Sequence, residues 1–308
     1  MEIKKRSELL KGEQKEMRWL VQDLIPYMNK PIMISGCPGS GKSLLGYQLA
    51  SCVAYGTPFL NHQTFKFNSM YLSFEDDEYD LSLRSQKSEK KVNPDAVEGN
   101  CFVFAADYTF ELTTVKNGKI TTGKDFEELK SFIIENEIKL IVIDHLSKIF
   151  CGDENNRNQV NEFGNILYQL CKDAKTMVII LAHTNKTDNQ YSGSSANAGI
   201  YRMAFLLTYS KSSEERTLSL LKSNSTSHIK PQRFIIDDDL FCSPISDTLK
   251  SDAFEIGKVY TREELCNIAG EELNTRAFAA FAAANKLIKE KNRKKINGIL
   301  KTVYKKGE

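Results

Sequence analysis

The sequence predicts an α/β protein: a mostly parallel sheet flanked by helices, followed by a small basic domain. Short β-rich runs alternate with segments of helical periodicity, which is typical of a covered parallel sheet. Two of these runs, 140–143 (LIVI) and 177–182 (MVIILA), are apolar on both faces, as in strands buried between two helical layers. After about residue 205 the pattern favours antiparallel strands instead.

The elements are expected in a simple order along the chain. The helix expected after the first strand carries Leu44, Leu45 and Leu49 on one side, which suits packing on a sheet. Pro244 and its polar neighbours predict a linker at 243–250, which divides the chain into domains 1–245 and 250–308. We expect strands at 31–35, 70–74, 101–105, 140–143, 177–182, 204–209, 216–221 and 233–236, and helices at 43–55, 126–135 and 160–171.

Composition excludes several classes of protein. The chain has 308 residues, of which 41% are hydrophobic, so it can form a full core and is not disordered. No apolar run reaches the roughly 18 residues that cross a membrane, and the charged N-terminus does not resemble a secretory signal. The 7 cysteines form no C-x-x-C pair, which favours free thiols in a reducing cytoplasm. The 4 histidines lie too far apart in sequence to suggest a zinc site.

One motif carries specific chemistry. Residues 36–43 fit the phosphate-binding pattern G-x-x-x-x-G-K-[ST], with a strand expected before them and a helix after them. The backbone N–H groups of such a loop point at phosphate oxygens, and the helix N-terminus adds a positive end. Lys42 is expected to reach the β- and γ-phosphates of ATP, and Ser43 to hold Mg²⁺. The nucleotide-binding residues are therefore Gly36, Cys37, Pro38, Gly39, Ser40, Gly41, Lys42 and Ser43.

Two acidic residues follow predicted strands. Asp144 ends the run 140–143, where an aspartate contacts Mg²⁺ directly or through water; the alternative is a helix N-cap. Glu75 follows the run 70–74 and is the candidate that orients the water attacking the γ-phosphate; the alternative is a solvated acidic turn.

A histidine follows another predicted strand. His183 closes the run 177–182 and is expected either to sense the γ-phosphate or to relay its presence to the following loop. The alternative is an ordinary histidine at a strand end.

Five further segments contain recognisable patterns: YLSFEDDEYDLSLR (Glu75, Asp76, Arg84), LIVIDHLSKIF (Asp144), LAHTNK (His183), GSSANAGIYR (Arg202) and LLKSNST (Lys222, Asn224). Taken in order with the phosphate loop, these motifs over about residues 20–235 resemble the RepA-like hexameric replicative helicases, a branch of the RecA-type ATPases. The resemblance implies a RecA-like fold and makes Glu75 the catalytic glutamate. One feature departs from the family: its frequent Gly-Pro pair after K-x-N is replaced by residues 225–227 (STS).

The resemblance also implies an assembly and a partner. In such rings, usually hexamers, the nucleotide lies between subunits, so Arg202 would reach a neighbour's site as an arginine finger and Lys222 would assist from the same side. Lys186 and the loops near Arg157 and at 192–195 would face single-stranded DNA in the ring centre. Surface positions without such a role are the alternative for each of these residues.

The C-terminal segment resembles a winged helix. Thr261 and Glu264 form a capping-box pattern that opens a short helix ending near Gly270; a second helix with Leu287 and Ile288 on its apolar side is expected next. A turn at 297–298 and a strand at 299–304 complete the pattern. The segment is expected to bind duplex DNA, with a protein-docking module or a solvated basic end as alternatives. Its candidate DNA-binding residues are Lys291, Arg293, Lys294 and Lys295.

Together these features predict a cytoplasmic, Mg²⁺-dependent ATPase. The family resemblance implies that it works as a DNA helicase, and the resemblance alone implies a setting in the replication of a plasmid, phage or other mobile element. Two alternatives remain open. One is a RecA-type ATPase that does not unwind DNA but acts as a switch in loading, partition or recombination. The other is a DNA-binding regulator whose ATPase controls its assembly.

Overall fold

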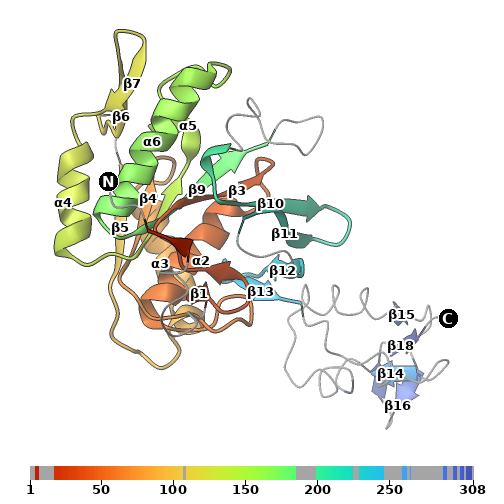
Figure 1. The fold of residues 1–308 in the computed structure, drawn as a ribbon. Helices are drawn as coiled ribbons and strands as arrows, with labels where there is room; N and C mark the ends of the chain where they lie inside the picture. Colours follow the sequence, from red (N-terminus) through yellow and green to blue (C-terminus); the bar gives the residue numbers. More distant parts are fainter. Residues whose placement is uncertain are drawn as a thin grey trace.

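The computed structural model describes residues 4–6, 17–106, 109–184, 199–224 and 229–245, and beyond them the short segments 259–261, 264, 287–289, 294–296, 299–301 and 303–306. A sheet of nine strands, in the order β13-β12-β11-β10-β3-β9-β8-β4-β5, dominates this part of the chain (Figure 1). Its strands are β3 (Pro31–Gly36), β4 (Ser69–Ser73), β5 (Cys101–Ala105), β8 (Leu140–Asp144), β9 (Met177–His183), β10 (Met203–Ser210), β11 (Glu215–Ser223), β12 (Gln232–Ile236) and β13 (Cys242–Pro244).

The sheet has a parallel part and an antiparallel part. The six strands from β5 to β10 pair in parallel, so their carboxyl ends lie along one edge. The remaining strands, β11 to β13, continue the sheet in antiparallel pairing from β10 outward. The predicted α/β class, the mostly parallel sheet and its change to antiparallel pairing after residue 205 are all confirmed.

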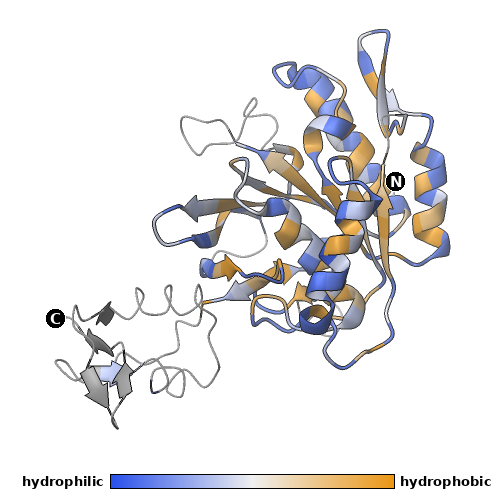
Figure 2. Ribbon diagram, turned by 180° about the vertical axis from the view of Figure 1, so that it is seen from behind, coloured by the Kyte–Doolittle hydropathy of each residue, from blue (hydrophilic) through white to orange (hydrophobic). Residues whose placement is uncertain are grey.

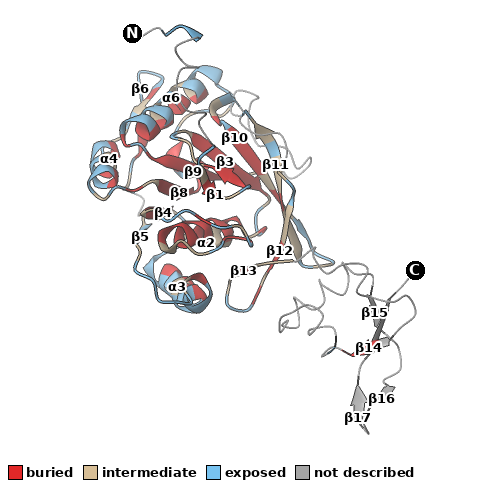
Figure 3. Cartoon of the chain, turned by 60° about the horizontal axis from the view of Figure 1, so that its bottom comes forward, coloured by how far each residue is buried: buried red, intermediate tan, exposed pale blue. Residues whose placement is uncertain are grey.

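Helices cover both faces of the sheet. The helices α2 (Lys42–Tyr55) and α3 (Glu78–Val92) pack on one face, and α4 (Phe126–Glu135), α5 (Leu146–Ile149) and α6 (Arg157–Asp173) pack on the other. Strand β8 shows why: Leu140 and Val142 join the core under α2, whereas Ile141 and Ile143 join the core under α6. The apolar residues gather on the strands and on the inward sides of the helices (Figure 2), and the central strands are buried (Figure 3).

Several elements were not predicted, and two of them, α3 and the hairpin of β6 and β7, bury few apolar side chains. Of the residues that α3 buries, only Leu81 and Val92 are apolar; the other two are Arg84 and Ser88. The same holds for the hairpin of β6 (Thr113–Lys116) and β7 (Lys119–Thr122), which is largely polar. Also unpredicted were α5 and the hairpin of β1 (Trp19–Val21) and β2 (Ile25–Pro26).

The predicted linker at 243–250 is wrong at its beginning. Ser243 and Pro244 belong to β13, the outermost strand, where Pro244 pairs with Phe234 of β12. Proline is compatible with an edge strand because one side of that strand needs no backbone donor.

The C-terminal predictions are confirmed only in part. The capping box is present: the Thr261 backbone N–H donates to Glu264 Oε2 (2.7 Å), and the Glu264 N–H donates to Thr261 Oγ1 (3.2 Å). The strand expected at 299–304 appears as β17 (Ile299–Lys301), which pairs with β16 (Lys294–Ile296), and β18 (Val303–Lys306).

One C-terminal prediction is wrong: Leu287 and Ile288 lie in a strand, β15 (Leu287–Lys289), not in a helix. This strand pairs with β18, which also pairs with β14 (Val259–Thr261). Ile288 is β-branched and suits a strand. The remainder of both expected helices and the turn at 297–298 lie outside the described residues.

Candidate functional site

The phosphate-binding motif forms the connection between β3 and α2. Gly36 touches the neighbouring strand, and a Cβ atom there would lie 2.6 Å from the Leu207 carbonyl oxygen. Gly41 has a φ of 94°, and a Cβ atom there would lie 2.5 Å from Ile236 Cδ1. Above Gly39, by contrast, an added Cβ atom would meet nothing within 4 Å. Neighbouring residues therefore constrain the loop closely at Gly36 and Gly41. The space beside Gly39 is open, and we expect phosphates to approach there.

Lys42, the first residue of α2, lies folded against the loop. Its Nζ donates to the carbonyl oxygens of Gly36 (2.9 Å) and Cys37 (3.0 Å) and lies 3.3 Å from His183 Nδ1. Burial lowers the pKa of Lys42, while the Asp144 carboxylate acts in the opposite direction. Because the residue is only 5% exposed, its ammonium group is a poorly hydrated cation held beside the phosphate loop.

The end of β8 supplies a carboxylate beside the loop. Asp144 is 1% exposed, and Tyr71 donates a hydrogen bond from its Oη to Asp144 Oδ2 (2.6 Å). The same hydroxyl lies 3.3 Å from the Ser43 carbonyl oxygen, so Asp144 and Ser43 are close together. Burial holds the pKa of Tyr71 well above its usual value, which keeps the donating proton in place. A carboxylate and a hydroxyl are oxygen donors of the kind that Mg²⁺ prefers, so these residues fit that ion.

The acidic residues in the turn after β4 make different contacts. Asp76 forms an ion pair with Arg84 (2.8 Å), and Asp77 caps α3 by accepting from the Asp80 N–H (2.9 Å). The Ser73 hydroxyl accepts from the Glu75 backbone N–H (3.3 Å) and fixes the turn. The Glu75 side chain remains 45% exposed, which leaves it accessible to water. Its catalytic role stays a prediction.

Arg84, singled out by the family resemblance, is a buried structural residue. It is 8% exposed and lies over the Tyr47 ring, 5.6 Å from the centroid. Its Nη1 donates to Tyr71 Oη (3.4 Å), so the chain of contacts runs from Asp76 through Arg84 and Tyr71 to Asp144. Burial raises the pKa of Asp76, although the Arg84 guanidinium acts to lower it. This chain orients the carboxylate that would support the metal.

Two histidines that are far apart in the sequence lie side by side in the fold, so their sequence spacing does not exclude a shared site. His145 follows β8 and His183 ends β9, and these strands are parallel neighbours. The ring centroids lie 4.9 Å apart, and His145 Nδ1 lies 3.2 Å from Glu75 Oε1. Burial, followed by the charges of Lys42 and His145, lowers the pKa of His183. Sequence spacing hid this pair; the rule that parallel strands end at one edge would have found it.

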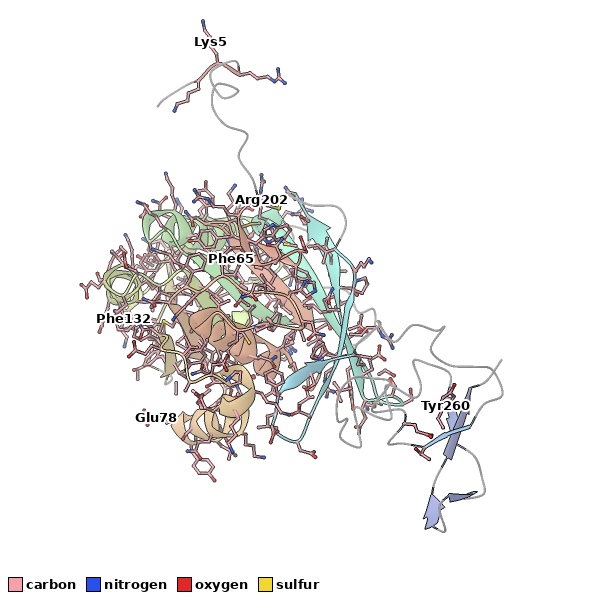
Figure 4. All side chains as sticks on the ribbon, turned by 90° about the horizontal axis from the view of Figure 1, so that it is seen from below. Lys5, Phe65, Glu78, Phe132, Arg202 and Tyr260 are labelled. Carbon is pink, nitrogen blue, oxygen red and sulfur yellow. The ribbon has the colours of Figure 1, made fainter. Side chains whose placement is uncertain are left out.

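Arg202 and Lys222 lie together at the opposite edge of the sheet. Arg202 precedes β10, and its backbone N–H donates to the Pro31 carbonyl oxygen at the start of β3 (3.1 Å). Lys222 pairs with Ala204, two residues further along β10. The register places Leu207 level with Gly36, so about 16 Å of strand separates Arg202 from its own phosphate loop. In Figure 4 Arg202 lies across the molecule from Glu78, the first residue of α3.

Arg216, at the beginning of β11, touches the phosphate loop directly and was not predicted. Its Nε donates to the Ser40 carbonyl oxygen (3.1 Å), and its guanidinium lies 4.4 Å from the Tyr209 ring centroid. In the sequence it is one arginine in a polar strand, and nothing local indicates the contact. It adds a cation beside the nucleotide position.

The predicted DNA-contacting residues are mostly beyond the described part of the chain. Lys186, the loop 192–195, Lys291 and Arg293 lie outside it; Lys294 and Lys295 lie in β16. In the loop before α6, Asn156 is a helix cap whose side chain accepts from the N–H groups of Asn158 (3.1 Å) and Gln159 (3.4 Å). Arg157 follows it and is exposed.

One cavity has a lining that includes none of these groups. It occupies about 500 Å³ between β5 and α4, and its lining is mainly apolar, with Phe102, Phe110 and Phe132, but also contains Asp125 and Glu128. Among the helices that the structure describes, none has the length and apolar character needed to cross a bilayer.

The comparisons with known proteins agree with this geometry. The family model described as "AAA domain" matches residues 2–189, which is more than half of the chain. This range contains the phosphate loop, Glu75, Asp144 and His183, which together form the carboxyl edge described above. No curated protein sequence matches the chain. Its phosphate loop, its α/β sheet and this match agree that the chain belongs to the AAA domain family of P-loop ATPases.

Proposed function

We propose that this ATPase is an ATP-driven DNA helicase of the RepA-like type, working as a ring, usually a hexamer, in the replication of a plasmid, phage or other mobile element. The observation that carries the proposal is the separation of Arg202 and Lys222 from the phosphate loop of their own chain. Two cations that belong to the family's motifs but lie at the wrong edge for their own nucleotide suit a site shared with a neighbouring subunit.

The residues at the carboxyl edge divide the reaction among them. Lys42 leaves its backbone acceptors and binds the β- and γ-phosphates, while Glu75 orients the attacking water. Mg²⁺, when bound by Ser43 and Asp144, neutralises charge on the phosphates. His183, beside Lys42, detects whether a γ-phosphate is present because Lys42 turns away from it when phosphate binds.

A strand-displacement assay on a forked DNA substrate tests the proposal, run beside a mass measurement with and without nucleotide. We expect ATP-dependent displacement by an oligomer, and none by the Lys42→Ala variant. Hydrolysis stimulated by single strands but without displacement at any salt concentration would support the non-unwinding switch instead. Tight duplex binding that only controls assembly would support the DNA-binding regulator.

A further inference from the structure

Three potential metal ligands meet at the carboxyl edge of the sheet. Glu75 follows β4, His145 follows β8 and His183 ends β9, and one ligand atom from each lies within 4.8 Å of the others. Among the described residues, no other group of three histidine, cysteine or acidic side chains is as close. These residues are distinct from Ser43 and Asp144, which offer only oxygen donors.

His145 has the burial and the hydrogen bonding that are typical of a metal ligand. The residue is 6% exposed, and its Nε2 lies 2.7 Å from Ser147 Oγ. On the other side of the ring, the Nδ1 atom lies 3.2 Å from Glu75 Oε1. Yet Nδ1 is buried and makes no hydrogen bond of acceptable geometry to any described residue. A hydrogen bond from the far nitrogen that fixes a ring while the near nitrogen stays available is the usual arrangement around a metal-ligating histidine.

The space between His145 Nδ1 and Glu75 Oε1 suits a cation. If Ser147 accepts the proton of Nε2, Nδ1 carries no proton and lies 3.2 Å from a carboxylate oxygen, so two hydrogen-bond acceptors are close together and repel each other. A divalent ion bound to both removes that repulsion. Two imidazole nitrogens and one carboxylate form a donor set typical of Zn²⁺ and related ions, and one that Mg²⁺ does not favour.

Lys42 opposes the ion in the present arrangement. Its Nζ lies 3.3 Å from His183 Nδ1, and two cations sharing one imidazole repel each other. Removing the ammonium group should therefore strengthen metal binding, although the same change removes phosphate binding. This opposite response separates the metal site from the nucleotide site.

We propose that Glu75, His145 and His183 bind a transition-metal dication of the Zn²⁺ type, and that this ion inhibits ATP turnover because it withdraws Glu75 and His183 from the γ-phosphate. The inhibition rests on the proposed function of Glu75 and His183. The binding itself does not.

Co²⁺, which takes the ligands of Zn²⁺ and absorbs visible light, is the probe. Co²⁺ is titrated into the metal-free chain without nucleotide, and we expect one bound ion per chain. The His145→Asn and His183→Asn variants should each bind Co²⁺ with an affinity about tenfold or more lower. His62→Asn is the matched control. His62 Nδ1 lies 2.9 Å from the Gln22 carbonyl oxygen and its Nε2 lies 3.0 Å from Gln232 Oε1, so its loss should leave Co²⁺ binding unchanged.

Two further variants keep the test decisive even if a histidine variant folds poorly. Ser147→Ala retains all three ligands and should weaken Co²⁺ binding several-fold, whereas Lys42→Met should strengthen it. Co²⁺ binding that is unaffected by His145→Asn and Ser147→Ala would overturn the site. A thiolate charge-transfer band lost in Cys37→Ser would do the same, since it assigns the ion to that cysteine.

Inhibition is measured separately, as the Zn²⁺ concentration that halves ATP turnover in excess Mg²⁺. It should rise about tenfold in His145→Asn. Co²⁺ binding without inhibition by Zn²⁺ would overturn the inhibitory role. Failure of strand displacement with intact Co²⁺ binding would reject the helicase proposal and leave the metal site standing.

Discussion

The two edges of the central sheet differ in how their charged residues are held. At the carboxyl edge Lys42, Asp144 and Arg84 are buried, and each is bonded to other residues of the same chain. At the opposite edge Arg202 is exposed and lies about 16 Å along the strand from its own phosphate loop. The carboxyl edge is thus held by contacts within the chain, whereas the opposite edge presents an exposed arginine far from the chain's own phosphate loop. Its action on a neighbouring subunit is part of our proposal.

The largest expected effect tests the exposed edge. Arg202→Ala should lower ATP turnover by about 10³-fold or more if it acts as an arginine finger, while nucleotide still binds to the intact phosphate loop. Turnover and nucleotide affinity are measured separately. Arg18→Ala, another exposed arginine, is the control and should change neither.

Mixing variants sharpens the same comparison. Protomers carrying Arg202→Ala, combined with protomers carrying Lys42→Ala, should regain part of the turnover, because a mixed interface pairs an intact loop with an intact arginine. No recovery in the mixture would mean that both edges serve one chain.

At the carboxyl edge, Glu75→Gln should lower kcat by about 10²- to 10⁴-fold, since the amide cannot accept the proton of the attacking water. ATP affinity should change little. Glu78→Gln, an exposed change in the first turn of α3, is the matched control. Equal losses in both variants would assign the effect to the charge of the turn rather than to Glu75.

Tyr71→Phe tests the buried hydrogen bond that holds Asp144 at the carboxyl edge. It removes the hydrogen bond to Asp144 and should lower the free energy of unfolding by about 1.5–3 kcal/mol, as for other bonds to a charged acceptor. The Mg²⁺ concentration for half-maximal turnover should rise. Tyr47→Phe removes a hydrogen bond to Ser85 instead, and should reduce stability without altering the Mg²⁺ requirement.

The smallest effect concerns Arg216. Arg216→Met removes the hydrogen bond to the Ser40 carbonyl oxygen, and KM for ATP should rise by about two- to tenfold, corresponding to about 0.5–1.5 kcal/mol. Arg233→Met breaks the ion pair with Glu215 on the same strands and serves as the control, with KM unchanged. A larger rise in KM for the Arg233 variant would contradict a direct role of Arg216.

The predictable parts of this protein are those whose chemistry is local in the sequence. The phosphate loop is continuous, and a run such as 140–143 has to be buried whatever surrounds it. The parts that escaped prediction depend on contacts between distant residues. The role of His145 depends on its contact with His183, and the role of Arg216 on its hydrogen bond to Ser40. Pro244 lies in a strand because it pairs with Phe234. Helix α3 escaped because it buries an arginine where a core helix usually buries an aliphatic side chain.

Strand β11 joins the two edges in a single element. Arg216 near its beginning bonds to the phosphate loop, and Lys222 near its end lies with the exposed arginine, about 20 Å away along the strand. The strand pairs with β10 on both sides of a register shift between Ala204 and Phe205. If Lys222 contacts a neighbour's nucleotide, a single strand joins that nucleotide to the chain's own phosphate loop. Nucleotide binding at one of these sites would then change the affinity of the other, and linkage requires the two effects to be equal.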